Sequence, residues 1–261
     1  MGPQKVISQI SVRVPFPTHR GYGIMTLFQG RKRPNGHLNH KYAIFVRQRG
    51  VFVMKMLTIA EAEKELKLAA QMNPGLWEQH SMSVARNARL IADKVNSSTA
   101  GEMDGDKAYV MGLMHDIGRR AGITGILHIL DGYDYMMGMG QEEIARICLT
   151  HSFPLKNINA FNGKYDCSPE QKRFLEQYLD KLEYNDYDML IQLCDAISLP
   201  NGACIMEKRL VDVAFRHGLQ DFTLDKWRAF LNVKKHFDEL CGCNIYSFLP
   251  NILENSSVNL V

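Results

Sequence analysis

The stretch that decides the fold runs from Met111 to Arg119 and reads MGLMHDIGR. It places an adjacent histidine and aspartate, His115 and Asp116, at the end of an otherwise apolar helical run. A carboxylate in apolar surroundings needs a partner that offsets the loss of its hydration, and a divalent metal is one such partner. Gly118 follows, and its missing side chain allows the backbone to turn sharply there. The stretch therefore predicts a helix that ends in a metal-binding pair.

Four further polar side chains interrupt apolar helical stretches on either side of this motif. They are His80 behind Trp77, His128 in GILHIL, His151 in ICLTH and Asp195 in LIQLCDAI. Any one such histidine is more often a hydrogen-bonded core residue than a metal ligand, and Asp195 alone could pair with a buried arginine. The set is less easily explained in that way. Imidazole and carboxylate together suit a divalent ion such as Mn, Fe, Zn, Co or Mg.

From residue 56 onward, helical periodicity dominates the sequence. Apolar side chains recur at helical spacing from Trp77 to Val95, and capping signals begin helices at Thr58 and Ser168. We expect helices over 58–71, 77–95, 104–115, 126–137, 141–150, 187–197, 204–216 and 224–240, another beginning at 168, and a polar loop over 153–166. No alternation long enough for a sheet follows residue 56. The sequence thus predicts a single all-α domain over 56–261.

The charge of the chain is unevenly distributed. Residues 1–55 hold ten Lys or Arg and no Asp or Glu, and the first acidic residue is Glu61. Subtracting these from the 31 basic and 28 acidic residues of the chain leaves 21 basic and 28 acidic side chains over residues 56–261, a net charge of −7. The overall charge of +3 therefore comes entirely from the first segment.

Residues 1–55 allow three interpretations. The segment could be a basic tail that touches nucleic acid or a membrane surface, or a targeting peptide, although it is poor in serine and has no amphipathic helix. We favour a third interpretation, in which an unstructured segment lies upstream of the true start. Met54 and Met56 stand directly before a capped helix, and Arg49-Gly50-Val51 can be encoded by AGG GGA GTN, which resembles a ribosome-binding sequence.

Other features exclude several classes of protein. The chain has no apolar run of about 18 residues, as a transmembrane helix would require, and its start lacks the pattern of a secretion signal. Its six cysteines lie mostly among apolar neighbours, which is typical of reduced core cysteines in a cytoplasmic protein. Cys241 and Cys243 lack a second pair with which to bind zinc. The phosphate-binding loop, dinucleotide fingerprint and nucleophile elbow are all absent.

The order His80, His115-Asp116, Asp195 resembles the motif of the HD superfamily, and His115 to Gly118 match its HDIG variant. The resemblance covers residues 76–198 and is closest to uncharacterised bacterial HDIG proteins. It implies an all-α helical bundle in which those four side chains hold a divalent metal. His128 and His151 match the additional histidines of a subgroup that binds a second ion. The Gly-Tyr-Pro segment of cyclic-dinucleotide phosphodiesterases is missing, which argues against that substrate.

The resemblance implies hydrolysis of a phosphoester or phosphoanhydride, with a phosphorylated small molecule such as a nucleotide as substrate. A metal pair can hold both the attacking and the leaving oxygen, and Asp116 is the natural bridge between two ions. Arg119, Arg120 and Lys156 lie near ligands in the sequence and could bind phosphate oxygens. Ordinary surface charge explains these three residues about equally well. We expect no membrane partner and no specific nucleic acid, and the sequence does not fix the oligomeric state.

Two other functions remain open at the level of sequence. The same six ligands serve HD-type di-iron oxygenases, which iron content, an absorption spectrum and oxygen consumption would identify. The domain could also be a non-catalytic ligand sensor that keeps the fold. The intact set of ligands disfavours this reading, and a lack of turnover on a broad nucleotide panel would favour it.

A first prediction concerns residues 1–53, which contain none of the candidate site residues. We expect a chain that begins at Met54 to match the full chain in thermal midpoint and activity, because the helical pattern begins only after that point. Differential scanning calorimetry of both chains checks this. A fall of several degrees on truncation would show that the segment stabilises the domain.

Overall fold

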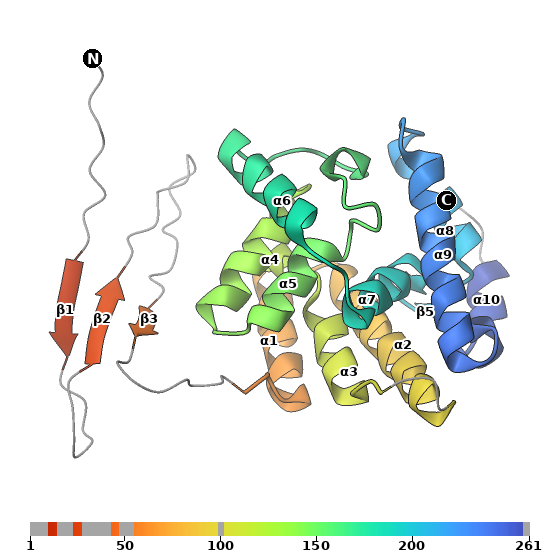
Figure 1. Cartoon of the computed structure of the whole chain (residues 1–261), viewed down its shortest axis with the longest axis horizontal. Helices are drawn as coiled ribbons and strands as arrows, with labels where there is room; N and C mark the ends of the chain where they lie inside the picture. The colour runs from red at the N-terminus through yellow and green to blue at the C-terminus, as the bar shows by residue number, and fades with distance from the viewer. Residues whose placement is uncertain (1–9, 15–22, 28–42, 47–54, 99–101, 258–261) are drawn as a thin grey trace. The chain divides into compact units, whose positions relative to one another are not determined.

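The computed structural model describes residues 55–98 and 102–257, together with three short strands in the first 54 residues. After residue 55 it is mostly helical, which confirms the predicted all-α class (Figure 1). The helices are α1 (Ile59–Met72), α2 (Trp77–Ser97), α3 (Gly105–Met114), α4 (Leu127–Gly138), α5 (Glu142–Thr150), α6 (Pro169–Lys181), α7 (Asp186–Ala196), α8 (Met206–His217), α9 (Thr223–Cys241) and α10 (Ile252–Ser257). Short 3₁₀ turns cover Ile117–Ala121, Ile158–Ala160 and Ile245–Ser247.

Capping side chains determine where several helices begin. The Thr58 hydroxyl accepts from the Glu61 backbone N–H at 3.3 Å, and the Glu61 carboxylate accepts from the Thr58 N–H at 2.8 Å, as the sequence predicted for α1. Ser168 caps α6 with the same reciprocal pattern. Asn185 caps α7, accepting from two backbone N–H groups. Each cap satisfies N–H groups that have no partner within the helix.

A short hairpin after α7 differs from the expectation of helices alone. β4 (Ser198–Leu199) and β5 (Gly202–Ala203) form a two-residue antiparallel ladder directly after α7. It is too short to leave an alternating pattern in the sequence. Gly202 occupies the turn side of this hairpin with φ 138°, a conformation that favours glycine.

The first segment is a unit separate from the helical one. We expected no regular structure in residues 1–55, but the structure describes β1 (Ile10–Val14), β2 (Gly23–Leu27) and β3 (Ala43–Val46). They pair antiparallel in the order β1-β2-β3, with Val12 opposite Met25 and Met25 opposite Phe45. Ile10 to Val14 alternates apolar and polar side chains, but strands of four or five residues are at the lower end of the length over which alternation indicates a strand. The position of the true start stays a prediction.

The helical unit is organised around α2. One cluster of buried side chains joins α2 to α3, α7 and α9, with Ile91, Leu190, Leu193 and Phe237 fully buried at its centre. α3 lies so close to α2 that a Cβ on Gly112 would be 2.6 Å from the Ala85 Cα. A second cluster packs α4 and α5 against α6, and Figure 1 shows these helices away from α9. The two clusters hold the ends of α3 and α5 in fixed positions.

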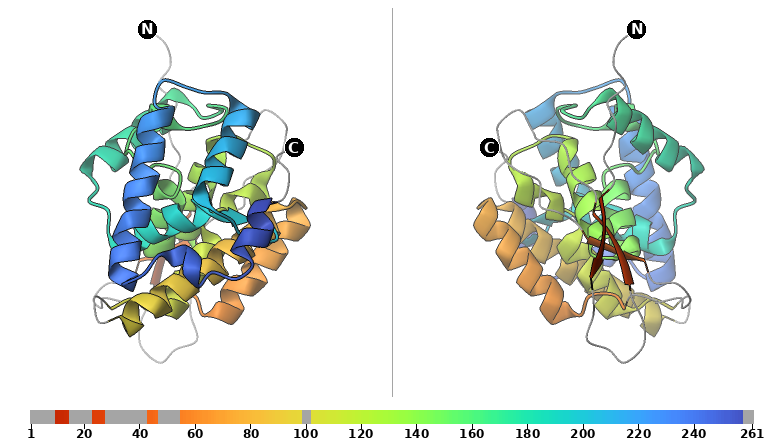
Figure 2. Two further views of the ribbon diagram at one scale, coloured as in Figure 1. Left: turned by 90° about the vertical axis from the view of Figure 1, so that its right-hand side faces the viewer. Right: turned by 90° about the vertical axis from the view of Figure 1, so that its left-hand side faces the viewer.

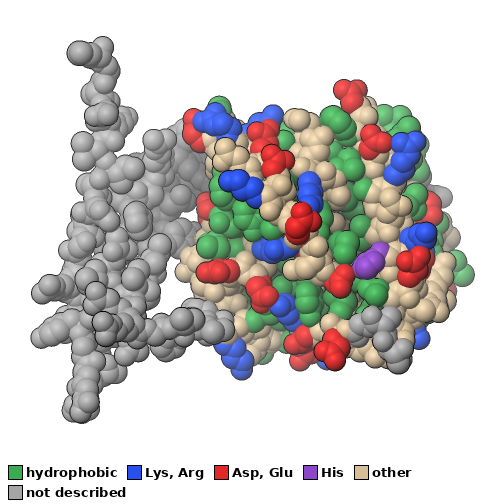
Figure 3. Space-filling model, in the orientation of Figure 1, with side chains coloured by type: hydrophobic (Ala, Val, Ile, Leu, Met, Phe, Trp, Pro, Cys, Tyr) green, Lys and Arg blue, Asp and Glu red, His purple; other side chains and the backbone are tan. Residues whose placement is uncertain are grey.

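The surface of the helical unit is mixed in charge. Acidic and basic side chains alternate over the face seen in Figure 3, with apolar side chains between them. Among the described residues, no helix is both long and apolar enough to span a bilayer. All six cysteines lie in the described part of the chain and none forms a disulfide.

Gly118 allows the turn after α3 to lie directly on α4. A Cβ at this position would be 1.9 Å from the His128 carbonyl oxygen and 2.5 Å from the Gly132 nitrogen. Both are backbone atoms, so they cannot move aside as a side chain could. The contact brings the start of α4, and with it His128, next to the end of α3.

We predict that Gly118→Ala lowers the free energy of unfolding by roughly 1–3 kcal/mol or more, as overpacking does in cores. Gly105→Ala is the matched control, because its Cβ would meet two side chains and no backbone atom: the half-exposed carboxylate of Asp93, which can rotate away, and the Arg89 Cγ at an ordinary 3.5 Å. Urea denaturation of both variants checks this. Equal stability of Gly118→Ala and the wild type would contradict the proposed close contact.

Candidate metal centre

His80, on α2, and Asp195, on α7, approach each other from opposite sides of the helical core. His80 Nε2 lies 2.9 Å from Asp195 Oδ1, and His115 Nε2, at the end of α3, lies 4.0 Å from the same oxygen. The rings of His80 and His115 meet edge to face, with centroids 5.5 Å apart. His80 and Asp195 thus lie in contact, although 115 positions separate them in the sequence.

Asp116 lies at the centre of the cluster and contacts residues on both sides. Its Oδ2 is 3.8 Å from His115 Nε2, while its Oδ1 is 3.1 Å from His128 Nε2 and 3.6 Å from His151 Nε2. Arg119 Nε donates to Oδ2 at 2.6 Å. The carboxylate is therefore shared between two groups of histidines, as the sequence analysis expected of a bridging ligand.

Backbone carbonyls fix the orientation of three of the imidazoles. His115 Nδ1 donates to Gly112 O at 2.8 Å, His128 Nδ1 to Gly125 O at 2.5 Å, and His151 Nδ1 to Cys148 O at 3.0 Å. A carbonyl oxygen can only accept, so each Nδ1 carries the proton. In the neutral ring, Nε2 is then left with a lone pair directed into the cluster. This is the usual arrangement of metal-ligating histidines.

Three buried polar atoms in the cluster have no hydrogen-bond partner among the described residues. They are His115 Nε2, His128 Nε2 and Asp116 Oδ1. An unsatisfied buried group costs about 1–3 kcal/mol, so three converging ones indicate a missing ligand. The side chains form two groups with potential ligand atoms within 4.8 Å of one another, namely His80 with His115 and Asp116, and Asp116 with His128 and His151. This donor set fits divalent metal.

The electrostatics of the cluster favour the forms that bind metal. Burial lowers the pKa of His115 and lowers that of His151 to about 3, so both rings are neutral near pH 7. Burial acts to raise the pKa of Asp116, but Arg119 and the neighbouring histidines hold it well below its usual range. The pKa of Asp195 is also lowered, by its hydrogen bond to His80 against the effect of burial. Neutral imidazoles thus face ionised carboxylates.

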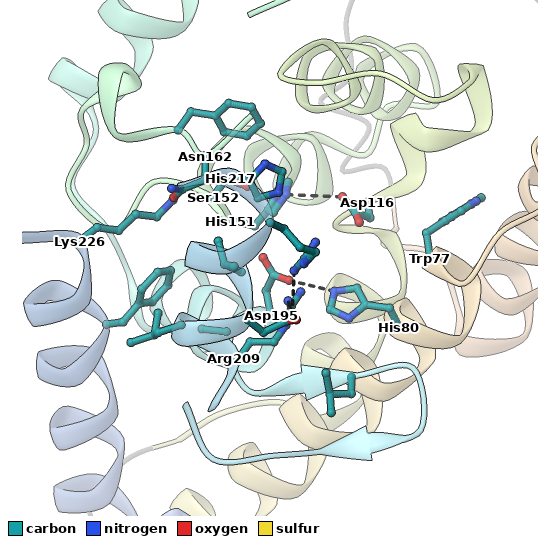
Figure 4. A pocket seen from close by; sticks show the side chains of 18 of the residues that line it. Trp77, His80, Asp116, His151, Ser152, Asn162, Asp195, Arg209, His217 and Lys226 are labelled. Atoms are coloured by element: carbon teal, nitrogen blue, oxygen red, sulfur yellow. Dashed lines mark hydrogen bonds and ion pairs between the residues drawn. The ribbon is translucent and has the colours of Figure 1, made fainter. Parts of the chain in front are cut away.

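The cluster opens into a pocket of about 530 Å³. The wall near the metal ligands contains Trp77, and Phe161 and Asn162 lie beyond His151. α8 and α9 provide the remaining wall (Figure 4). The volume lies within the usual range for small-molecule sites.

The structure brings together all six residues that the sequence analysis assigned to metal: His80, His115, Asp116, His128, His151 and Asp195. Arg119 also reaches the pocket. Lys156 does not, because its chain turns away after α5 at φ 53° and its ammonium donates to Leu182 O at 2.5 Å. Arg120 stacks over the Tyr135 ring at 3.8 Å instead. Neither Lys156 nor Arg120 is therefore placed to bind phosphate in this pocket.

Sequence reasoning missed the residues of α8 and α9 that line the pocket, among them Arg209, Lys226 and Trp227. Charges on an amphipathic helix normally face solvent, so nothing in the local pattern separates these from surface residues. His217 is exposed, and it also lines the pocket.

Comparison with known families agrees with this geometry. The family model described as HD domain matches residues 77–199. Neither the curated proteins nor the solved structures include a significant match to the chain.

We predict that His115→Ala and Asp116→Ala each weaken metal binding by at least tenfold, because loss of a ligand costs no less than the roughly 10–100-fold typical of outer-shell partners. Metal content after dialysis, measured by mass spectrometry, checks this, with circular dichroism as the test of folding. His236→Ala is the control, since His236 pairs with Asp186 at 2.9 Å on the surface. Full metal content in both site variants would refute the assignment.

Proposed function

Residues 77–199 form an HD domain, and on that premise we propose that the chain is a metal-dependent phosphohydrolase that acts on a phosphorylated small molecule, namely a nucleotide. The observation that carries the proposal is the set of three unpartnered buried atoms, on His115, Asp116 and His128, that converge in one pocket. They are the atoms that divalent metal would engage, and hydrolysis of phosphoesters is a principal use of such sites.

Four side chains, His80, His115, Asp116 and Asp195, would hold one ion, and Asp116 with His128 and His151 would hold a second. A bound divalent ion lowers the pKa of water and offsets the negative charge of phosphate oxygens. Because both groups share Asp116, the two sites are expected to be coupled. Removing this carboxylate should affect both, whereas removing His128 or His151 should affect only the second.

Arg119 has two roles in this proposal. Its Nε–H holds the Asp116 carboxylate in one orientation and helps to keep it ionised. The guanidinium also lines the pocket, where its other N–H groups can donate to a phosphate oxygen with the planar geometry that arginine offers. A lysine at this position would supply charge but could not make both sets of contacts.

The aromatic side chains of the pocket support a nucleotide as the substrate. Trp77, Trp227, Phe161 and Phe230 all line it, and such rings offer flat apolar surfaces against which a base can stack. Trp77 Nε1 donates to Asn73 O at 2.8 Å, which fixes the orientation of that ring. Phosphate groups would then lie toward the metal ligands and the base toward the aromatic side chains.

We predict that the wild type hydrolyses at least one member of a nucleotide panel when Mn or Fe is supplied. His128→Ala and His151→Ala should each reduce the metal content from two ions toward one and lower the rate by about 10²-fold or more, the scale typical for loss of a principal electrostatic group. Metal analysis and phosphate release measure these two effects.

Two outcomes would contradict the proposal in different ways. Oxygen consumption with bound iron, in the absence of phosphate release, would identify a di-iron oxygenase. Normal metal content with no turnover on the whole panel would indicate a ligand sensor. Unchanged metal content in both histidine variants would leave a one-metal site built from the other four ligands.

A further inference from the structure

The wall of the pocket opposite the histidines lies outside the matched HD domain. It is formed by α8 and α9, which Figure 2 shows linked by a loop at one end. Both helices turn charged side chains toward the pocket: Arg209, Asp212 and Arg216 from α8, and Lys226 from α9. Three cations therefore face one carboxylate on this wall.

Lys226 is the least compensated of these cations. Its ammonium donates to Asn162 Oδ1 at 2.9 Å and to Ala160 O at 3.1 Å, and both acceptors are neutral. No carboxylate oxygen lies within 4.0 Å of it in the part of the chain that the structure describes. Burial lowers its pKa to about 8, and the opposing effect of the Asp195 carboxylate, which does not contact it, is smaller.

A second lysine of the same helix shows what a compensated position looks like. The ammonium of Lys234 is also largely buried, but it donates to Asp238 at 2.6 Å and to Asn244 at 3.2 Å. Buried charges are normally paired in this way. The missing carboxylate at Lys226 is therefore not a general property of α9. It is confined to the position that faces the pocket.

The two arginines of α8 do not remove the excess of positive charge. Arg209 and Arg216 both pair with the single carboxylate of Asp212, at 3.1 and 3.0 Å. Arg209 also donates to the Ser198 carbonyl at 3.2 Å. One carboxylate thus pairs with two guanidiniums, and none among the described residues pairs directly with Lys226.

We propose that Lys226 binds an anionic group of the substrate other than the phosphoryl group held at His115 and Asp116. Figure 4 shows Lys226 and Asp116 on opposite sides of the pocket, with His151 and Asp195 between them. The two side chains therefore mark separate places in one pocket. The proposal rests on the proposed function in that it assigns the substrate class: a molecule with at least two anionic groups, such as a nucleoside diphosphate or triphosphate.

The test is calorimetric binding of inorganic pyrophosphate and inorganic phosphate to the metal-loaded protein. We expect the wild type to bind pyrophosphate more tightly than phosphate. Lys226→Met and Lys226→Gln should weaken pyrophosphate binding by roughly tenfold or more, the scale of a hydrogen bond to a charged group. Their metal content should not change. Lys226→Arg keeps the charge and should stay within about threefold of the wild type on the same scale.

Lys235→Met is the matched control, because Lys235 lies on the same helix and its side chain is 76% exposed. It should bind pyrophosphate as the wild type does. The thermal midpoint of each variant without ligand shows whether it folds, and Gln can still donate to the Ala160 carbonyl if Met destabilises α9. Equal affinity of wild type and Lys226→Gln, equal loss in Lys235→Met, or no preference of the wild type for pyrophosphate would each overturn the proposal.

The failure of this inference can be told apart from failure of the proposed function. If the panel shows no hydrolysis but pyrophosphate still binds in a Lys226-dependent manner, the anion site stands and the catalytic proposal fails. If nucleoside monophosphates are hydrolysed as well as diphosphates, with the same rate in Lys226→Gln, the catalytic proposal stands and the anion site fails.

Discussion

The structure depends on the compensation of one buried carboxylate, that of Asp116. Its side chain is 6% exposed, so its negative charge must be balanced by groups that the fold brings to it. Arg119 provides one balancing contact from the next turn of the chain, and the imidazoles provide polar atoms but no full positive charge, because burial keeps His115 and His151 neutral. The remaining negative charge lies on Asp116 Oδ1, which accepts no hydrogen bond from the described residues. A divalent ion there would complete the balance.

Helix ends explain why the ligands can converge without strain. His115 and His151 follow the last residues of α3 and α5, where backbone carbonyls lack partners within the helix. The Nδ1 atoms take up two of these carbonyls, at Gly112 and Cys148. The same contacts that satisfy the helix ends therefore select the ring nitrogen that faces the proposed metal site. One set of hydrogen bonds thus satisfies the carbonyls at the helix ends and also orients the imidazoles.

The sequence was sufficient to single out the part of the site that lies in apolar helical stretches. A histidine or aspartate inside an apolar helix is conspicuous because burial is costly, and this made His80, His128 and Asp195 recognisable before their contacts were known. It was not sufficient where charge is ordinary, as for Lys226 and Lys156 on amphipathic or polar stretches. Proximity to ligands in sequence favoured Lys156, but the turn after α5 directs it away. Only tertiary packing distinguishes the two lysines.

The pocket is accordingly divided into two regions, one formed by the HD domain and one by α8 and α9. The histidines and carboxylates of the HD domain would set the type of chemistry, since they fix donor types and protonation. The wall from α8 and α9 would contact the rest of the molecule that enters. A phosphate chain would link the two regions, with one end neutralised at Asp116 and its neighbours and the other at Lys226. Recognition of the substrate would then depend on a part of the chain that the family motif does not include.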